Sequence, residues 1–301
     1  MDPPIEPLES DCCNSGCNPC ILDIYEEQLK KYNQRKTQEK NQIVHMNCIL
    51  PTAYTVFTVN NIEPHCKDAV FITFEYSRFI KQTDHGNDVK PLKVMFNPGQ
   101  YLMLKTGPTN QEFQRPYTPL PTENADNLKF TVLIKLYEIG QMSSYIRKLK
   151  CGSNTVWRGP YGNFSINYSY KHILLIAQGV GITSLYGIIC DIIKQEECDS
   201  FLKLYFCCKS FDTIYLRNKL YSLQSNWNFS YELFLSNPEN VDEKYNETVH
   251  KAKLEVDVLK TYLKDKVDNT QVLICGNEHF MQCFKEIVIC CKVDEKNIVL
   301  F

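Results

Sequence analysis

The chain has 301 residues, long enough for two domains, and its hydrophobic content of 44% lets each domain bury a core. Its net charge of −2 excludes the basic surplus with which nucleic-acid-binding proteins meet phosphates. Its 15 cysteines follow no secretory signal and lie scattered through apolar runs, so we expect reduced thiols in an intracellular compartment rather than a disulfide framework.

The apolar stretches of the chain are short. The longest, such as 173–177 and 185–193, cannot cross a bilayer. We therefore expect a cytoplasmic protein with no transmembrane segment, and the sequence leaves peripheral association with an intracellular membrane open.

Four cysteines lie within nine residues near the N-terminus, at 12, 13, 17 and 20. Cys13 (or its neighbour) with Cys17 and Cys20 could bind zinc or an iron–sulfur centre, and Cys17 and Cys20 could instead form a redox dithiol. The plainer alternative is a tight turn before a docking helix. An apolar stripe predicts that helix over 21–40, so residues 1–45 are expected to form a small module with a linker.

From about residue 47 the hydrophobic pattern changes to a period of two. β-Branched and aromatic residues predict about six short antiparallel strands, at 54–59, 69–76, 93–96, 100–105, 128–137 and 153–157. Six strands can close into a Greek-key barrel that leaves no free edge. We assign this barrel to residues 46–168.

Inside this region, Arg115-Pro116-Tyr117-Thr118 has the chemistry of a cofactor cradle. Arg115 offers a charged planar fork for a phosphate, Tyr117 a ring that can stack, and Thr118 a small hydroxyl. The alternative is an edge strand stiffened by prolines. A short helix predicted over 142–149 would direct its first N–H groups at a pyrophosphate, although Met142 could equally be a core residue.

After residue 169 the pattern alternates between strands and helices up to residue 301, which predicts a doubly wound parallel sheet with ligands at the carboxyl ends of its strands. Gly179-Val180-Gly181 follows the first of these strands and Cys275-Gly276 ends a later one. A glycine doublet of this kind favours phosphate binding but is also common in tight turns. Cys275 could likewise be a buried thiol with no role in binding.

The loop after the second parallel strand is expected to meet the adenosine ribose. Asp212 would repel a 2′-phosphate there, whereas Lys209 could attract one, so NADH is favoured over NADPH. Arg217 is expected on a helix surface.

Taken in order, the segments 115–120, 135–137, 140–143, 159–162, 179–183 and 275–276 resemble the ferredoxin–NADP reductase superfamily, and most closely the NADH–cytochrome b5 reductases. The cysteine-rich start resembles a small oxidoreductase-like N-terminal domain. The resemblance covers nearly the whole chain. It implies a six-stranded antiparallel Greek-key barrel that binds FAD, followed by a doubly wound parallel-sheet domain that binds NADH.

The resemblance also implies residue roles. Thr118 would lie near the reactive edge of the flavin, Lys135 near flavin and nicotinamide, and Cys275 beside the nicotinamide, so these three are the candidate catalytic residues. The implied cofactor-binding set is Arg115, Pro116, Tyr117, Thr118, Leu133, Lys135, Tyr137, Gln141, Met142, Ser143, Gly179, Gly181, Thr183, Asp212, Cys275 and Gly276.

These features predict an FAD-dependent oxidoreductase that passes electrons from NADH to a one-electron haem acceptor such as cytochrome b5. The chain departs from the family pattern at Val180, Ser184, Asn277 and Glu278. The alternative hypothesis is therefore a catalytically weakened reductase fold with an interaction or metal-handling role, and a quinone or an iron–sulfur protein is another possible acceptor.

Overall fold

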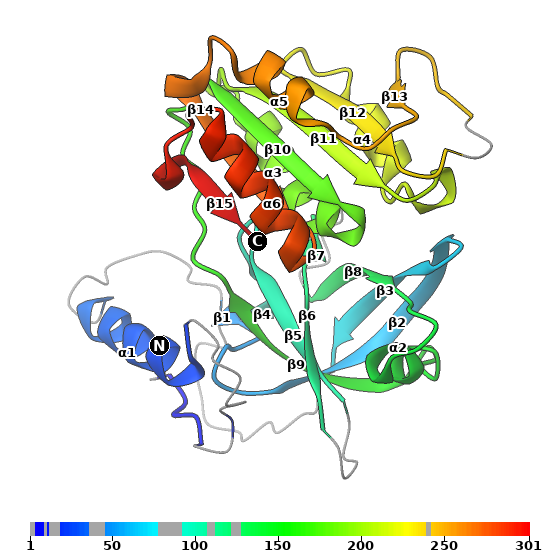
Figure 1. The fold of residues 1–301 in the computed structure, drawn as a ribbon. Coiled ribbons are helices and arrows are strands. Elements are labelled where there is room, and N and C mark those ends of the chain that lie inside the picture. Colours follow the sequence, from blue (N-terminus) through cyan, green and yellow to red (C-terminus); the bar gives the residue numbers. More distant parts are fainter. Residues whose placement is uncertain are drawn as a thin grey trace. The chain divides into compact units, whose positions relative to one another are not determined.

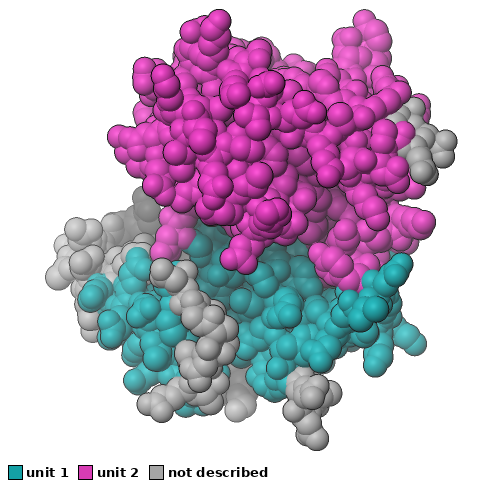
Figure 2. All heavy atoms as spheres, in the orientation of Figure 1, with its two compact units in different colours: residues 1–62, 72–132, 138–162 teal, residues 63–71, 133–137, 163–301 magenta. Residues whose placement is uncertain are grey.

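The computed structural model describes residues 4–8, 11, 19–35, 46–77, 92–106, 112–121, 128–238 and 242–301 (Figure 1). The chain forms two compact units, coloured separately in Figure 2. Unit 1 comprises Met1–Ile62, Ile72–Val132 and Glu138–Gly162, and unit 2 comprises Glu63–Phe71, Leu133–Tyr137 and Asn163–Phe301. Two short pieces of the first half of the chain therefore belong to the unit built mainly by the second half.

The first sheet has the strand order β6–β5–β9–β2–β3–β8–β7. Its strands are β2 (Thr55–Cys66), β3 (Ala69–Tyr76), β5 (Tyr101–Lys105), β6 (Gln114–Tyr117), β7 (Pro119–Leu120), β8 (Lys129–Lys135) and β9 (Asn154–Tyr161). Only Thr118 separates β6 from β7, and these two segments pair antiparallel with β5 and β8 at opposite ends of the order. One bent strand thus closes the sheet, and the predicted six-stranded barrel is confirmed. Its sixth strand is this bent segment and not the predicted strand at 93–96, because Leu92–Lys93 pairs outside this sheet.

Aromatic side chains fill the barrel. Trp157 is fully buried, and its ring packs edge-on against Phe74 at 4.8 Å and Phe130 at 5.1 Å. Its indole N–H donates to Thr155 Oγ1 at 2.9 Å, so the one polar atom of the ring is satisfied. Phe57 completes the cluster against Phe130 at 5.0 Å. This core fixes the strands on which the first set of site residues lies.

The second sheet is parallel throughout, with the order β13–β12–β11–β10–β14–β15. Its strands are β10 (His172–Gln178), β11 (Phe201–Cys208), β12 (Phe229–Leu235), β13 (Thr248–His250), β14 (Thr270–Cys275) and β15 (Ile298–Leu300). The order reverses beside β10, which places β11 on one side of it and β14 on the other. Doubly wound sheets bind ligands at such a reversal, so the predicted fold class is confirmed and the site region is defined.

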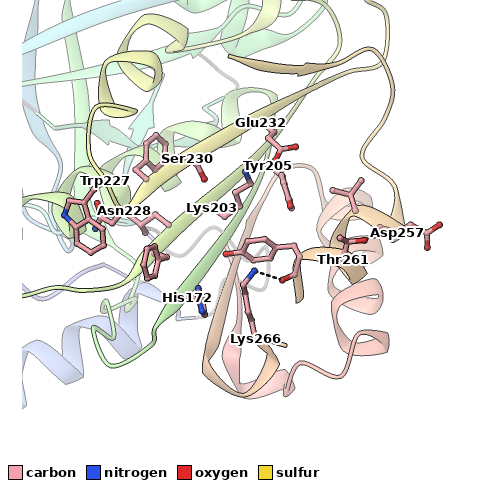
Figure 3. Close-up of a pocket in the computed structure, with 15 residues that line it drawn as sticks. His172, Lys203, Tyr205, Trp227, Asn228, Ser230, Glu232, Asp257, Thr261 and Lys266 are labelled. Atoms are coloured by element: carbon pink, nitrogen blue, oxygen red, sulfur yellow. Dashed lines mark hydrogen bonds and ion pairs between the residues drawn. The ribbon is translucent and has the colours of Figure 1, made fainter. Parts of the chain in front are cut away.

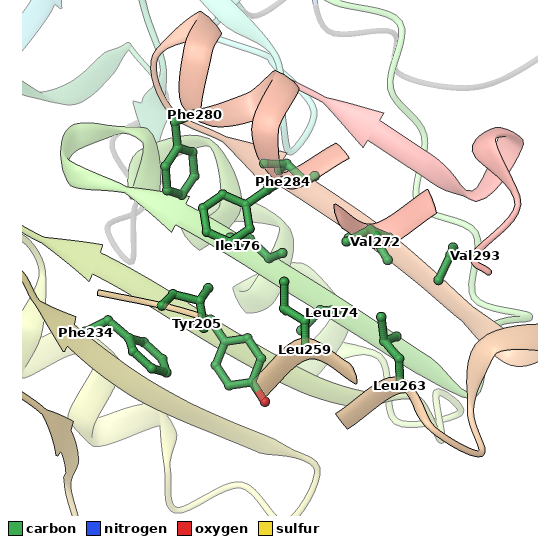
Figure 4. Close-up of a cluster of buried hydrophobic side chains, with 13 residues drawn as sticks. Leu174, Ile176, Tyr205, Phe234, Leu259, Leu263, Val272, Phe280, Phe284 and Val293 are labelled. Atoms are coloured by element: carbon green, nitrogen blue, oxygen red, sulfur yellow. The ribbon is translucent and has the colours of Figure 1, made fainter. Parts of the chain in front are cut away.

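Helices pack on this sheet. They are α3 (Ile182–Lys194), α4 (Arg217–Leu223), α5 (Val256–Leu263) and α6 (Glu278–Cys290). Helices α5 and α6 share one hydrophobic cluster with the strands, in which Leu259, Leu263 and Phe284 meet Leu174 and Ile176 (Figure 4). Burial of such apolar side chains stabilises the unit by about 25 cal/mol per Å².

The remaining elements are short or lie near the N-terminus. They are α1 (Ile21–Arg35), α2 (Gln141–Ile146), a small parallel pair formed by β1 (Met46–Asn47) and β4 (Leu92–Lys93), and the 3₁₀ turns η2 (Gly179–Gly181), η3 (Phe211–Thr213), η4 (Val267–Asn269) and η5 (Glu295–Asn297). Helix α4 begins at Arg217, after the 3₁₀ turn η3. Leu216 has φ 59°, a left-handed conformation that interrupts a helix.

Candidate functional site

In unit 1, strand β6 presents the predicted cradle. Arg115 and Pro116 are exposed, and the Arg115 guanidinium donates one hydrogen bond to the carbonyl of Gln114 at 2.7 Å. No carboxylate of the described residues lies within ion-pair distance of this guanidinium. The Tyr117 ring meets Trp157 edge-on at 6.0 Å and is half-buried. The segment therefore combines an accessible cation with a ring held by the barrel core, which suits a phosphate joined to a flat ring system.

Helix α2 carries three further predicted residues. Met142 and Ser143 are buried, whereas Gln141 is exposed at the first helical position. Gly140, the residue before the helix, offers no side-chain cap to the first N–H groups. Packing in the protein interior is thus enough to explain a methionine at position 142. Polar contact with a ligand would come from the first turn of the helix.

In unit 2, the carboxyl ends of β10 and β14 lie side by side, with Ala177 paired to Cys275. The loops that follow are in close contact, because a Cβ atom on Gly181 would stand 2.8 Å from the Cys275 carbonyl oxygen and 3.1 Å from its Sγ. Gly276 is equally confined, since its Cβ would stand 2.9 Å from Cβ of Gln178. The structure therefore brings Gly179, Gly181, Cys275 and Gly276 together at the predicted end of the sheet.

The thiol of Cys275 is a buried, neutral group. Burial raises its pKa to about 11, and its Sγ donates to the Phe301 carbonyl at 3.7 Å. The Phe301 amide in turn donates to the Ile274 carbonyl at 3.0 Å, which holds the end of the chain along β14. Cys275 can therefore act by packing and weak hydrogen bonding, because nucleophilic attack would require the thiolate.

Thr183 and Asp212 lie at the same end of the sheet. The buried Thr183 hydroxyl donates to the Val180 carbonyl at 2.9 Å and so supports the glycine turn. Asp212 is exposed in η3, which follows β11 and is stabilised by a reciprocal capping box between Ser210 and Thr213. Its carboxylate is thus accessible at the loop where a ribose is expected.

Arg217 is not the surface residue that the sequence predicts. Its guanidinium forms an ion pair with Glu247, a carboxylate that is only 6% exposed and also accepts from the Tyr231 hydroxyl at 2.6 Å. Burial alone would raise the pKa of Glu247, but the hydrogen bonds from Arg217 and Tyr231 hold it below its usual value. The charge of Arg217 is therefore balanced by a carboxylate inside the protein.

Of the three predicted residues at the end of β8, Leu133 is buried, Lys135 is half-buried and Tyr137 is exposed. The Lys135 ammonium lies 3.5 Å from the Asp68 carboxylate and 5.4 Å from the centre of the Tyr137 ring. Asp68 also accepts a hydrogen bond from Tyr215. Sequence reasoning missed Asp68 and Tyr215, because these two residues are far apart in the chain and show no local pattern.

A hollow of about 780 Å³ lies at the opposite end of the parallel sheet (Figure 3). It is lined by the first residues of β10, β11 and β12, by helix α5, and by Trp227 and Lys266. The glycine turns and Cys275 are not among its lining residues. Because parallel sheets bind nucleotides at the carboxyl ends of their strands, this hollow is not the expected dinucleotide site despite its size.

The predicted metal site lies mostly outside the described residues, as Cys13 and Cys17 do. Cys20 is half-buried just before α1. Among the described residues no group of His, Cys, Asp or Glu could hold a metal ion, so the prediction of zinc or an iron–sulfur centre has no support. No disulfide links the cysteines within the described ranges. No helix in these ranges is both long and apolar enough to cross a membrane.

Three family models match the chain in succession. They are the oxidoreductase-like protein N-terminal family over residues 2–41, the oxidoreductase FAD-binding domain over 79–166, and the oxidoreductase NAD-binding domain over 175–286. The chain is 29% identical over 309 residues to a human protein named NADH-cytochrome b5 reductase-like, covering 99% of this chain and 94% of that protein. The mouse protein of the same name is 28% identical, with 99% and 95% covered.

Solved structures share the fold. The cytochrome b5 reductase domain of Ulva prolifera nitrate reductase superposes with a TM-score of 0.70 at 15% identity, covering 85% of this chain and all of that one. The CS-b5R domains of human Ncb5or, in an NAD+ form, give a TM-score of 0.68 at 22% identity, covering 83% of this chain and 69% of that one. Both agree with an antiparallel barrel followed by a doubly wound parallel sheet.

Proposed function

We propose that the chain is an FAD- and NAD-binding oxidoreductase of the cytochrome b5 reductase family and that it passes electrons from NADH through FAD to a one-electron haem acceptor such as cytochrome b5. FAD supplies the chemistry when bound, because a flavin can accept a hydride and release electrons singly. The protein has to bind both cofactors and align them.

The observation that carries the proposal is the convergence of the glycine turn after β10 with the end of β14. Gly181 and Cys275 are so close that no side chain fits between them. This leaves backbone N–H groups and small atoms at the carboxyl end of the sheet, as close approach of a dinucleotide requires. Gly179, Gly181 and Gly276 would then bind NADH, with Cys275 as a neutral neighbour of the nicotinamide.

In unit 1, the exposed fork of Arg115 would pair with the FAD pyrophosphate, and Tyr117, braced by Trp157, would pack on the flavin. Pro116 restricts the strand between them. Thr118 would hydrogen-bond near the reactive edge of the flavin. Gln141, Met142 and Ser143 would support the phosphates from the start of α2, with Gln141 as the exposed member.

Two charges support NADH over NADPH. Asp212 is exposed in the loop where the ribose is expected and would repel a 2′-phosphate. Arg217, the nearby cation in the chain, is already paired with buried Glu247. Lys209 is exposed and opposes this preference only in part.

The visible absorption spectrum of the purified protein, before and after anaerobic addition of NADH, tests the proposal. We expect a flavin band that NADH bleaches and that returns when oxidised cytochrome b5 is added. A flavin band that only NADPH bleaches would contradict the assignment of Asp212. Failure to retain or take up FAD would contradict the proposed function itself, and failure of cytochrome b5 to restore the band would contradict only the choice of acceptor.

A further inference from the structure

Asp68 connects three segments of unit 2. It lies at the turn between β2 and β3, inside the segment Glu63–Phe71 that belongs to this unit. Its Oδ1 accepts from the Tyr215 hydroxyl at 2.9 Å, its Oδ2 lies 3.5 Å from the Lys135 ammonium, and its carbonyl accepts from the Leu136 amide at 2.7 Å. The turn, the end of β8 and the segment after η3 therefore meet at one carboxylate.

The Tyr215 side of this connection is rigid. Tyr215 is fully buried, and burial together with the hydrogen bond to Asp68 raises the pKa of its phenol, so the hydroxyl remains a donor. A second link runs parallel to it, since His65 Nε2 accepts from the Leu216 amide at 3.0 Å. Asp68 is consequently held on one side by a group that cannot move far.

The contact between Asp68 and Lys135 is less tightly held. The side chains of Lys135 and Asp68 are 31% and 28% exposed, and 3.5 Å is longer than a direct charged hydrogen bond. A half-exposed ion pair of this kind contributes little to folding stability. It does limit the conformations of a long side chain that otherwise has a large rotamer entropy.

We propose that Asp68 is a positioning residue that holds the Lys135 ammonium ready for the reduced dinucleotide, with Tyr215 fixing the carboxylate. The inference rests on the proposed function and on the family resemblance, which implies that Lys135 lies near the flavin and the nicotinamide. Ordering a cationic side chain before binding lowers the entropic cost of binding. Loss of Asp68 should therefore weaken the affinity for NADH more than it slows flavin reduction.

Anaerobic stopped-flow measurement of flavin bleaching at several NADH concentrations separates the apparent Kd from the limiting rate. We expect Asp68→Asn to raise the apparent Kd about tenfold, and Tyr215→Phe about threefold, while the limiting rate changes less than about threefold. The matched control is Glu63→Gln. It removes the same charge from an exposed position of strand β2, within the same segment Glu63–Phe71, and should leave both quantities unchanged.

A double-mutant cycle tests whether Asp68 acts through Lys135. In a Lys135→Met background, Asp68→Asn should change the apparent Kd by less than about twofold, because its partner is already gone. A merely structural role would weaken NADH binding equally in both backgrounds, which would overturn the proposal. So would an Asp68→Asn protein that matches Glu63→Gln.

The same experiment distinguishes the two levels of inference. If NADH does not bleach the flavin of the wild-type protein, the proposed function fails and the role of Asp68 fails with it. If the wild type is bleached and Asp68→Asn behaves as the wild type does, only the role of Asp68 is wrong.

Discussion

At Gly181, packing can require a glycine just as ligand binding can. A Cβ atom there would stand 2.8 Å from the Cys275 carbonyl oxygen, a distance that real Cβ atoms essentially never show. Its backbone has φ −59°, which any residue adopts. The glycine is therefore required by its neighbour across the turn and not by its own conformation.

The contact with Cys275 decides whether Gly181→Ala stabilises or destabilises the protein. Without the clash, alanine would stabilise the protein by about 0.4–1 kcal/mol through the unfolded state. With the clash we expect a loss of about 1–3 kcal/mol in the free energy of unfolding and weaker NADH binding. Urea unfolding of the two proteins measures the first and NADH titration the second. A more stable variant would contradict the packing around Cys275.

Cys275 should behave as an unreactive thiol. Its pKa is raised to about 11 by burial, whereas Cys151 and Cys283 are exposed. We expect iodoacetamide at pH 8 to alkylate Cys275 at least about tenfold more slowly than these two, because only the thiolate reacts. Peptide mapping by mass spectrometry after timed labelling gives the rates. Fast labelling of Cys275 in the native protein would mean that the strand end is open.

Among the secondary-structure elements, the turn between β2 and β3 has the least expected role. The segment Glu63–Phe71 interacts with Tyr215 and Leu216, the residues just before α4. Leu216 adopts a left-handed conformation, and its amide is satisfied by His65 rather than by a helix carbonyl. His65, near the end of β2, thus acts as a cap for a helix that begins about 150 residues further along the chain.

This cap predicts a pH dependence. Burial lowers the pKa of His65 from 6.5, while Glu63 opposes this shift and Lys219 adds to it. The native state therefore binds this proton less readily than the unfolded state does. The stabilisation is complete above pH 6.5 and is lost as the pH falls towards the lowered value, because protonated Nε2 can no longer accept from Leu216.

A His65→Gln variant provides the comparison, since a glutamine carbonyl can accept the same amide but does not titrate. We expect the wild type to lose more free energy of unfolding between pH 8 and pH 5.5 than the variant loses, and the difference isolates His65 from other titrating groups. Parallel urea titrations measure both. Equal losses in the two proteins would show that the hydrogen bond to Leu216 contributes nothing.

At the scale of the whole molecule, each unit contains one of the two tryptophans. Trp157 is buried in the barrel of unit 1, whereas Trp227 is 69% exposed in unit 2. The tryptophan fluorescence of a Trp227→Phe variant therefore reports on unit 1 alone. The difference between its fluorescence and that of the wild type reports on unit 2.

Removal of FAD should act first on the barrel. A ligand at 100 times its Kd stabilises the state that binds it by about 2.7 kcal/mol, which corresponds to roughly 5–10 °C for a unit of this size. We expect stripping of FAD to lower the thermal midpoint of Trp157 fluorescence by this amount in the Trp227→Phe variant. An unchanged midpoint, with FAD shown to be bound beforehand, would contradict flavin binding by unit 1.

Much of this architecture is predictable from local pattern. The hydrophobic period of two in the first half predicts a barrel, and the apolar run before Gly179 predicts a parallel sheet. Arg115–Thr118 stands out by its chemistry. The double pairing around Thr118 is not predictable, because it depends on which strands become neighbours. Asp68 and Tyr215 are missed for the same reason, since 147 positions separate them and neither belongs to a motif.

Unit 2 takes in Glu63–Phe71 and Leu133–Tyr137, and this interleaving has a consequence for biosynthesis. When Asp68 leaves the ribosome, Tyr215 has not yet been translated, and Phe301, whose carbonyl accepts from Cys275, is translated later still. Unit 2 therefore cannot complete its fold from Asn163–Phe301 alone, because two of its segments come from the first half of the chain. A truncated nascent chain that ends before Tyr215 would leave Asp68 without its phenol partner, and one that ends before β14 would leave the glycine turn without Cys275.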